Sequence, residues 1–439
     1  MKYDFKKLDE IVKIIGQKYF IDPSHEEVGK QKIEFWKILM GAFSYLGNKN
    51  SLLLGNPGSG KTTYSGVISA VMSGLPYDLF DKEKIQGHPD QTKDTMLARA
   101  DLGRIAEEGV VVQAPLYLPS LTLDELNRLP PGKQSIFLEY IRTGAVEHLG
   151  KVFTRGKTPI FATMNYNGTG TYPVPAPSLD RFDISLEFEA GPGWLQDDIA
   201  EASGNIEREL TNPDLTKEIV DKILDKNVAQ DQKTAFIEAK AGENRKRKNL
   251  PGLPKFEGID KKALSPDAVT YMECIWDEIN KPYLYGENRG VDPRDKSSHS
   301  KDFACHKVKS GVSNRYWQSI NFYANMLAHF LGHDKIEIEH INAVAPYCMS
   351  HRLDFDPDYA AKSAEAPRLN GERQEQDLSR RLLKDIKTNY DKVSDDLKLL
   401  DKHNRDVPVD NKERLKEILA GPVPDHPTFR EYYNLAKSQ

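Results

Sequence analysis

Residues 55–62 of the 439-residue sequence combine three glycines with a lysine and a threonine, directly after three consecutive leucines. The glycines allow the backbone to turn its N–H groups inward around a polyphosphate, a conformation that a Cβ would hinder. Lys61 adds a compact positive charge for the β- and γ-phosphates, and the Thr62 hydroxyl is placed to hold Mg²⁺. An apolar strand before the loop and a helix over residues 63–72 supply the context that this spacing requires. The residues expected to bind a nucleoside triphosphate are Gly55, Asn56, Pro57, Gly58, Ser59, Gly60, Lys61, Thr62 and Thr63.

The composition indicates a globular protein of two or three domains rather than a disordered chain, since hydrophobic residues make up 38% and charged residues 29% of the sequence. No run approaches the roughly 18 apolar residues that a membrane-spanning helix needs. The first residues lack a signal-peptide core, so we expect a cytoplasmic protein. A net charge of −5 gives no global attraction to nucleic acid or to an anionic membrane.

Two smaller features are interpreted as structural. Cys274, Cys305 and Cys348 lie far apart without metal-binding spacing, which indicates buried or unreactive thiols. The basic cluster at residues 245–248 is shorter than a usual nucleic-acid patch, so we expect a solvated loop.

The sequence divides into segments of different character. Residues 5–48 show apolar spacing typical of helices that lead into a first strand. Residues 51–190 alternate strand-like and helix-like runs, the signature of an α/β sheet, with a helix predicted over 132–142. The predicted strands are Ser51–Leu54, Gly109–Gln113, Leu118–Leu123, Pro159–Thr163 and Ile184–Phe188. The predicted domains are an N-terminal helical segment at 1–24, an α/β nucleotide-binding domain at 25–200, a charged insert and linker at 201–258, a helical domain at 259–360 and a helical extension at 361–439.

The second half of the chain is predicted to be helical. Ser265 and Pro266 form a good helix start, residues 281–310 look like a polar loop, and helices are expected over 313–331 and 339–351. Further on, a heptad-like stripe comprises Ile386, Tyr390, Val393, Leu397 and Leu400. Two heptads are too few to indicate a coiled coil. We interpret the stripe as part of a helical hairpin with residues 409–420, a structural appendage in preference to an oligomer or partner contact.

Hydrolysis of a nucleoside triphosphate also needs a metal holder, a group that orients water and a sensor for the γ-phosphate. An apolar run ends in Asp124 and Glu125, so Asp124 can hold the Mg²⁺ shell and Glu125 can polarise the attacking water. Another strand ends at Asn165, which places an amide near the same phosphate. Arg181 follows a Pro-rich loop and could be presented to a neighbouring molecule or pair with Asp180 or Asp183.

Together, these motifs resemble the MoxR family of AAA+ ATPases. The resemblance covers about residues 25–355 and rests on ordered blocks: the loop at 55–62, Asp124-Glu-Leu-Asn-Arg-Leu-Pro-Pro131, Ala162-Thr-Met-Asn165, residues 170–182, Gly311-Val-Ser-Asn-Arg315, Ala345-Pro346 and His351-Arg352. It implies a P-loop α/β AAA+ core with a parallel sheet and flanking helices, plus an all-α lid; the C-terminal helical extension has no counterpart. It also places a helix-2 insert at 104–115 and a pre-sensor β-hairpin at 144–153.

The resemblance assigns roles to single residues. Asn165 is similar to the family's sensor 1, Arg181 to its arginine finger and Arg315 to its sensor 2 arginine. Arg128 matches an arginine of the family motif whose role stays open. The implied assembly is a hexameric ring that binds ATP and Mg²⁺ between subunits.

The implied function is ATP-driven remodelling or maturation of a protein partner, for which a protein with a von Willebrand factor A domain is a candidate. The sequence departs from the family pattern in three places: Gly29-Lys30 stands where the family often has Gly-Gln, Thr122 interrupts an aliphatic strand, and residues 204–310 are longer than the usual connection to the lid.

Two alternative functions stay open. One is a DNA-directed motor, disfavoured because the hairpin contains Glu147 and only Lys151 as a firm cation. The other is an assembly switch gated by nucleotide.

Overall fold

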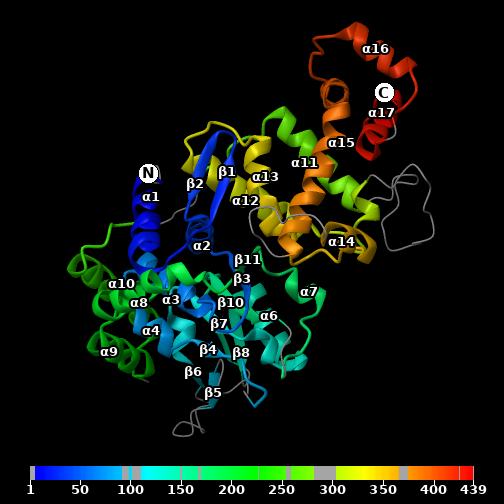
Figure 1. The fold of residues 1–439 in the computed structure, drawn as a ribbon. Helices are drawn as coiled ribbons and strands as arrows, with labels where there is room; N and C mark the ends of the chain where they lie inside the picture. The colour runs from blue at the N-terminus through cyan, green and yellow to red at the C-terminus, as the bar shows by residue number, and fades with distance from the viewer. Residues whose placement is uncertain are drawn as a thin grey trace. The chain divides into compact units, whose positions relative to one another are not determined.

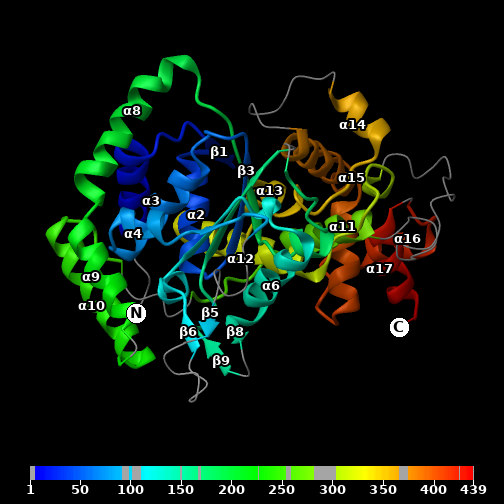
Figure 2. The same cartoon turned by 90° about the horizontal axis from the view of Figure 1, so that it is seen from below.

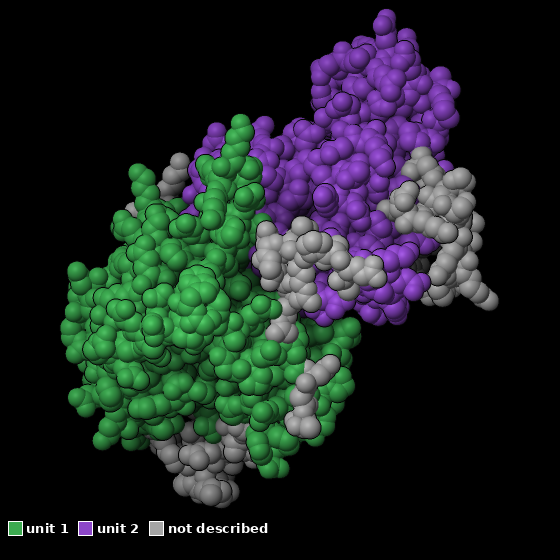
Figure 3. All heavy atoms as spheres, viewed as in Figure 1, with its two compact units in different colours: residues 1–259 green, residues 260–439 purple. Residues whose placement is uncertain are grey.

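The computed structural model describes residues 5–90, 98–100, 110–148, 151–166, 170–225, 227–253, 259–280, 303–364, 374–424 and 426–438. The chain forms two compact units, Met1–Ile259 and Asp260–Gln439, which are coloured separately in Figure 3. Among the described residues, no helix is both long enough and apolar enough to cross a bilayer. The side chains of Cys274, Cys305 and Cys348 are all buried.

A parallel five-stranded sheet forms the centre of the first unit, in the order β11-β3-β10-β7-β4 (Figure 1). Its strands are β3 (Asn50–Gly55), β4 (Ile85–Gln86), β7 (Leu121–Asp124), β10 (Ile160–Asn165) and β11 (Ile184–Phe188). The strands β3, β10 and β11 read as nearly continuous buried runs, as expected when helices cover both faces of a parallel sheet. All five carboxyl ends therefore lie at one edge.

Helices from the same unit cover this sheet: α2 (Trp36–Leu46), α3 (Lys61–Ser73), α4 (Tyr77–Lys82), α6 (Pro131–Thr143) and α7 (Ala176–Leu179). The helix predicted over 132–142 is α6, which begins at Pro131 and ends before Gly144 with a positive φ of 65°. Its buried Phe137 and Tyr140 pack in one cluster with Leu121, Leu123 and Ile160 of the sheet.

The segment predicted as a charged insert contributes to the core of the first unit. It contains the second half of α8 (Gln196–Asn205) and all of α9 (Pro213–Leu224) and α10 (Gln230–Arg247), and the last two lie side by side in Figures 1 and 2. Ile219, Ile223 and Ile237 from α9 and α10 pack with Leu79 and Tyr117. The high charge of this sequence reflects the outer faces of helices whose inner faces are apolar.

The solvated loop expected at residues 245–248 is instead the end of α10 and the turn after it. Arg245 donates hydrogen bonds to the carbonyls of Val71 and Met72, at the end of α3, and to the carbonyl of Pro251. The last carbonyls of a helix have no partner within the helix, so a guanidinium is a suitable donor for them. The expectation of a solvated loop was wrong because the acceptors of Arg245 lie at the end of α3, which is distant in the sequence.

Two-stranded antiparallel hairpins add to the unit: β1 (His25–Val28) with β2 (Gln31–Glu34), β5 (Ala98–Ala100) with β6 (Val110–Val112), and β8 (Ala145–His148) with β9 (Lys151–Thr154). The first corrects the helical interpretation of residues 5–48, where α1 (Phe5–Ile14) and α2 flank the hairpin.

The predicted strand at 109–113 pairs in the second hairpin, outside the central sheet. Residues 114–117 form a 3₁₀ turn, so the strand expected from Leu118 begins at Leu121. Residues 104–109 of the expected insert lie outside the described residues, and the hairpin predicted at 144–153 is β8–β9.

The second unit is helical: α11 (Pro266–Asn280), α12 (Asn314–Phe330), α13 (Ile338–Met349), α14 (Pro357–Ala364), α15 (Gln374–Asn404), α16 (Lys412–Ala420) and α17 (Pro427–Ser438). The predicted helix start is confirmed, because the Ser265 hydroxyl accepts from the N–H of Ala268. Residues 281–302 of the expected polar loop lie outside the described part of the chain.

The heptad-like stripe of α15 is occupied within its own unit. Ile386, Tyr390, Leu397 and Leu400 are all buried, and α15 packs mainly on α11, with α13 and α17 as further neighbours. An Arg414–Asp396 ion pair joins α16 to α15, as expected for a hairpin. The stripe therefore packs mainly within the second unit, which favours the structural interpretation over an oligomer contact.

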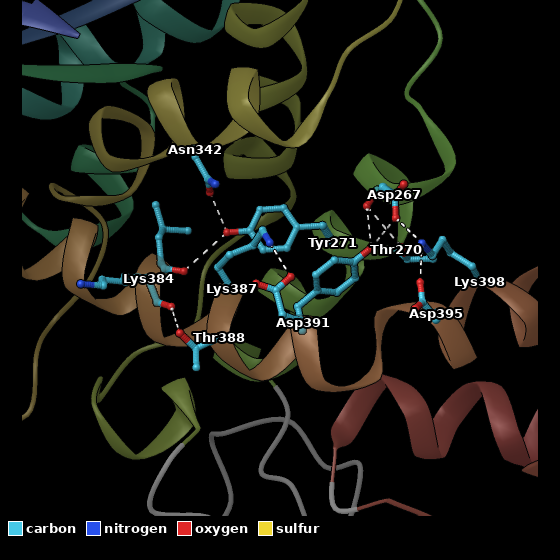
Figure 4. A network of polar contacts seen from close by, with 12 residues as sticks. Asp267, Thr270, Tyr271, Asn342, Lys384, Lys387, Thr388, Asp391, Asp395 and Lys398 are labelled. Atoms are coloured by element: carbon cyan, nitrogen blue, oxygen red, sulfur yellow. Dashed lines mark hydrogen bonds and ion pairs between the residues drawn. The ribbon is translucent and has the colours of Figure 1, made fainter. Parts of the chain in front are cut away.

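Hydrogen bonds between α11 and α15 fix their register (Figure 4). The Tyr271 hydroxyl on α11 is 3.5 Å from the Leu383 carbonyl on α15 and 2.6 Å from Asn342 Oδ1 on α13, and the Tyr390 hydroxyl on α15 is 2.9 Å from Thr270 Oγ1 on α11. Lys398 Nζ, also on α15, lies 2.9 Å from Asp267 Oδ1 on α11. Burial raises the pKa of both tyrosines, so these hydroxyls stay protonated as donors.

A buried acid–base pair lies elsewhere in the same packing. Glu278 on α11 and His426, just before α17, are fully or almost fully buried, with His426 Nε2 3.6 Å from Glu278 Oε1. The other carboxyl oxygen of Glu278 accepts from the N–H of Ala304 and from Asn389 Nδ2, each at 3.3 Å. Burial raises the pKa of Glu278 to about 8 and lowers that of His426 to about 4. Both groups are therefore predominantly neutral near pH 7.

We expect Glu278→Gln to stabilise the protein at pH 8 by on the order of a few kcal/mol, and much less at pH 5. The folded state retains the Glu278 proton up to a pKa of about 8, whereas the unfolded chain loses it near the ordinary value of 4.5. Folding therefore takes up a proton between these values, and stability falls as the pH rises through this window. Glutamine keeps a side-chain oxygen that can accept hydrogen bonds, but it does not ionise in this pH range.

Urea unfolding of the full chain at the two pH values measures this difference. Glu413→Gln, at an exposed position of α16, is the matched control and should change stability equally at both. An equal effect of Glu278→Gln at pH 5 and pH 8 would contradict the assignment.

Candidate nucleotide-binding site

The glycine-rich loop joins the carboxyl end of β3 to the start of α3. A Cβ on Gly55 would lie 2.3 Å from the Phe188 carbonyl oxygen of the adjacent strand, so only glycine fits there. Gly60, immediately before the helix, has a φ of 82° and sets the tight turn into α3. The loop amides and the helix N-terminus consequently face one edge of the sheet, as a phosphate-binding site requires.

Lys61 is the first residue of α3, and its side chain folds back into the loop. Its Nζ donates to the carbonyls of Gly55 and Asn56, at 2.9 and 2.7 Å, and to Ser59 Oγ at 3.3 Å. The residue is only 6% exposed, so its charge acts in a partly desolvated environment where electrostatic attraction is stronger than in water. This position suits the binding of a polyphosphate.

Thr62 of α3 meets Asp124 of β7, although β10 lies between β7 and β3, the strand that leads into α3. Thr62 Oγ1 donates to Asp124 Oδ1 at 2.9 Å. A hydroxyl and a carboxylate oxygen are suitable donors for Mg²⁺, which takes one or two protein ligands and completes its octahedron with phosphate oxygens and water. The described residues contain no group of three or more His, Cys, Asp or Glu side chains able to form an all-protein metal site. The pair fits a metal shared with a nucleotide.

Glu125 follows β7 with a φ of 55°, which turns its carboxylate back along the sheet edge. Three side chains donate to it or pair with it. Asn165 Nδ2 is 3.1 Å and Arg128 Nη2 3.2 Å from Oε1, while Gln86 Nε2 is 3.0 Å from Oε2. Both carboxylate oxygens are therefore engaged by residues of the same chain.

The structure thus brings Glu125 and Asn165 together, as the sequence motifs imply, and gives Arg128 a position beside Glu125. Two further residues of the site, Gln86 and Thr163, were not predicted from the sequence. Gln86 belongs to a strand of two residues, too short for any periodicity to reveal. Thr163 contacts both carboxylate-bearing residues only because β10 pairs with β7. Thr122, noted as an interruption of the strand, is buried and donates to Ser65 Oγ of α3 at 3.2 Å.

Arg181 lies away from this cluster, before the amino end of β11. Ile184 pairs with Ser51 and Phe188 with Gly55, so Arg181 lies at the edge of the sheet opposite the loop. Its guanidinium donates to the Leu138 carbonyl on α6, and Nε has no hydrogen-bond partner among the described residues. Of the two aspartates considered from the sequence, Asp183 lies 3.1 Å from Lys49 Nζ.

Arg315 belongs to the second unit, in the first turn of α12. Ser313 caps this helix through a 3.2 Å hydrogen bond from the N–H of Arg315, whose side chain is exposed. A helix N-terminus presents Arg315 on a defined element. Its approach to the nucleotide stays a prediction.

Comparison with known proteins agrees with this geometry. Residues 50–184 match a family described as "ATPase family associated with various cellular activities (AAA)". This stretch contains the loop, Asp124, Glu125, Asn165 and Arg181. A search of curated proteins found no match.

The crystal structure of a presumed ATPase from Cytophaga hutchinsonii is similar to 88% of this chain, over 94% of its own length, with a TM-score of 0.51 and 17% sequence identity. At this identity the likeness concerns the fold alone. The fold is that of an AAA-type ATPase. It comprises the parallel α/β core and a helical extension.

We expect Gly87→Ala to disrupt the Glu125 turn. A Cβ on Gly87 would lie 2.2 Å from the Glu125 carbonyl oxygen and 2.9 Å from that of Asp124, and neither backbone atom can move independently of the carboxylates. The overpacked site should lower the free energy of unfolding by about 1–3 kcal/mol and reduce ATP hydrolysis. Gly132→Ala is the control, since its Cβ meets no atom within 4 Å. Equal behaviour of the two variants in urea unfolding and turnover would contradict the expectation.

Proposed function

We propose that this protein is a ring-forming ATPase that hydrolyses ATP to remodel or mature a protein partner. The observation that carries the proposal is the separation of its catalytic groups. The loop, Thr62, Asp124, Glu125 and Asn165 gather at one edge of the sheet, whereas Arg181 lies at the opposite edge. Such a site is complete only when a second copy supplies the arginine.

ATP binding is assigned to the loop amides, Lys61 and the pair formed by Thr62 and Asp124. The amides and the ammonium group neutralise the phosphates, while Thr62 and Asp124 hold Mg²⁺. When bound, the metal neutralises charge that develops on the β- and γ-phosphate oxygens. The structure supports this assignment through the 2.9 Å contact between Thr62 and Asp124.

Glu125 is the proposed base that orients the attacking water. Oε1 accepts from Asn165 and pairs with Arg128, whereas Oε2 accepts from Gln86, which leaves an acceptor site on Oε2 for the attacking water. Asn165 is suited to move, since its amide can donate to a γ-phosphate oxygen instead of to Glu125. We therefore interpret the observed arrangement as a resting state.

Arg181 is the proposed arginine finger for the neighbouring subunit. The six residues of β3 span about 17 Å at roughly 3.3 Å per residue, and Arg181 lies beyond the far end of this strand. No rotamer of one side chain covers that distance. An arginine supplied in trans can increase the rate by about 10³–10⁵, and a head-to-tail contact repeated around an axis closes a ring. A hexamer is the size proposed from the MoxR resemblance.

A protein partner is proposed in preference to nucleic acid, because the net charge of −5 gives no general attraction to phosphate backbones. The motifs shared with the MoxR family support a partner that carries a von Willebrand factor A domain. Arg315 is proposed to contact the nucleotide as a sensor.

Purified protein with Mg²⁺ should hydrolyse ATP, and Glu125→Gln should lower kcat by about 100-fold or more while ATP still binds, because a missing base removes proton transfer without removing the phosphate contacts. Phosphate release and binding of a fluorescent ATP analogue measure the two effects. Glu139→Gln, at an exposed position of α6, is the matched control. Absence of turnover in the wild type at every protein concentration would overturn the proposal.

A mixture of Glu125→Gln and Arg181→Ala proteins, each inactive alone, should recover turnover. In randomly mixed rings, roughly a quarter of the interfaces pair an intact Glu125 with an intact Arg181 of the neighbour. Steady-state hydrolysis is compared with mixtures of the Glu125→Gln protein and the double variant, which contain no complete interface. No recovery in rings shown by mass measurement to be mixed would exclude an action of Arg181 across subunits.

A further inference from the structure

Thr163 lies at the centre of the site, although no sequence motif assigns it a role. It is on β10, the strand between β3 and β7, and is 1% exposed. Its neighbour Ala162 pairs with Leu123, so Thr163 lies beside the end of β7, where Asp124 and Glu125 follow. A buried hydroxyl at this position requires hydrogen-bond partners.

The hydrogen bonds of Thr163 have a defined direction. Thr163 Oγ1 is 2.7 Å from Asp124 Oδ1 and 2.8 Å from the backbone nitrogen of Glu125. A backbone N–H can only donate and a carboxylate only accepts, so the single hydroxyl hydrogen goes to Asp124 while a lone pair accepts from Glu125. One side chain therefore joins the proposed metal ligand to the backbone of the proposed base.

The Glu125 backbone needs such support. Its φ of 55° lies in the left-handed region, which a residue with a side chain adopts only when its surroundings hold it there. The Thr163 hydroxyl holds the N–H of this residue, and the Gly87 N–H holds the preceding carbonyl of Asp124 at 2.6 Å. Without the hydroxyl, the Glu125 N–H would lose this partner, and the turn would lose one of the hydrogen bonds that hold its backbone.

Asp124 is fixed from two sides by hydroxyl groups. Oδ1 accepts from Thr163 on β10 and from Thr62 on α3. A metal coordinated by Thr62 would replace the second contact, whereas the contact with Thr163 can persist. Thr163 can therefore keep Asp124 in the same rotamer when Thr62 exchanges its hydrogen bond to Asp124 for a contact with the metal.

From these contacts we infer that Thr163 is a positioning residue for hydrolysis, setting the orientation of both the metal-side carboxylate and the base. The inference rests on the proposed ATPase function. It requires that loss of the hydroxyl impairs Mg²⁺ use and kcat, but not the binding of the nucleotide phosphates by the loop and Lys61.

The test compares Thr163→Val with Thr122→Val. Both changes replace a hydroxyl by a methyl group at a buried threonine of the same sheet, but Thr122 bonds to Ser65 and not to a carboxylate. We expect Thr163→Val to lower kcat and to raise the Mg²⁺ concentration for half-maximal activity, each by about 10- to 100-fold, the usual effect of losing a group that orients a metal ligand. Thr163→Ser should restore both within about threefold, since it keeps the hydroxyl. The KM for ATP and metal-free binding of a fluorescent ATP analogue should change less than twofold.

Urea unfolding shows whether each variant is folded, and Thr163→Ala replaces Thr163→Val if the latter is not. Thr163→Val and Thr122→Val proteins with equal kcat and equal Mg²⁺ dependence would overturn the inference, as would failure of Thr163→Ser to recover them. A wild type without turnover refutes the ATPase proposal instead. In that case the Mg²⁺ dependence of nucleotide binding still decides whether Thr163 positions Asp124.

Discussion

The parallel pairing of β10 with both β3 and β7 is the constraint on which the site depends. It places Asn165 opposite Gly55, and Ala162 opposite Leu123, so that the ends of three strands come to one edge. A shift by one residue would move every side chain of β10 to the other face of the sheet. Thr163 would then no longer reach Asp124, and Asn165 would no longer reach Glu125. The apolar residues that fix this register therefore also fix the chemistry.

The sequence predicted the features that are local in the chain. The loop from Gly55 to Thr62 is recognisable because its glycines and lysine act within eight residues, and the acidic pair follows an apolar run. Gln86 and Thr163 could not be predicted, because their roles come from strand pairing rather than from neighbours in sequence. Arg245 was misinterpreted for the same reason, since its acceptors at the end of α3 are distant in the chain. The N-terminal hairpin was missed because its strands have only four residues each.

The stripe on α15 shows a different limit of sequence patterns. Its spacing correctly indicated a helix with one apolar face, but the same spacing is compatible with a partner outside the unit and with one inside it. Burial of Tyr390 and its contact with Thr270 identify the partner as α11. Polar groups such as Glu278 and Asn389 are enclosed by the same packing. Because buried polar groups require hydrogen-bond partners, the interface between α11 and α15 allows fewer relative positions of the two helices than a purely apolar interface would.

The position of Glu125 has a consequence for the proposed assembly. In the resting state its carboxylate accepts from Asn165 and Gln86 and pairs with Arg128 of its own chain, while Arg181 of the same chain lies at the opposite edge. Bringing a neighbour's Arg181 to the phosphates would stabilise charge in the transition state, but would not by itself move Asn165 away from Glu125. Moving Asn165 requires a better acceptor for its amide, and a bound γ-phosphate offers one. Under this arrangement nucleotide binding and subunit contact act on different groups, so hydrolysis would depend on both together and on neither alone.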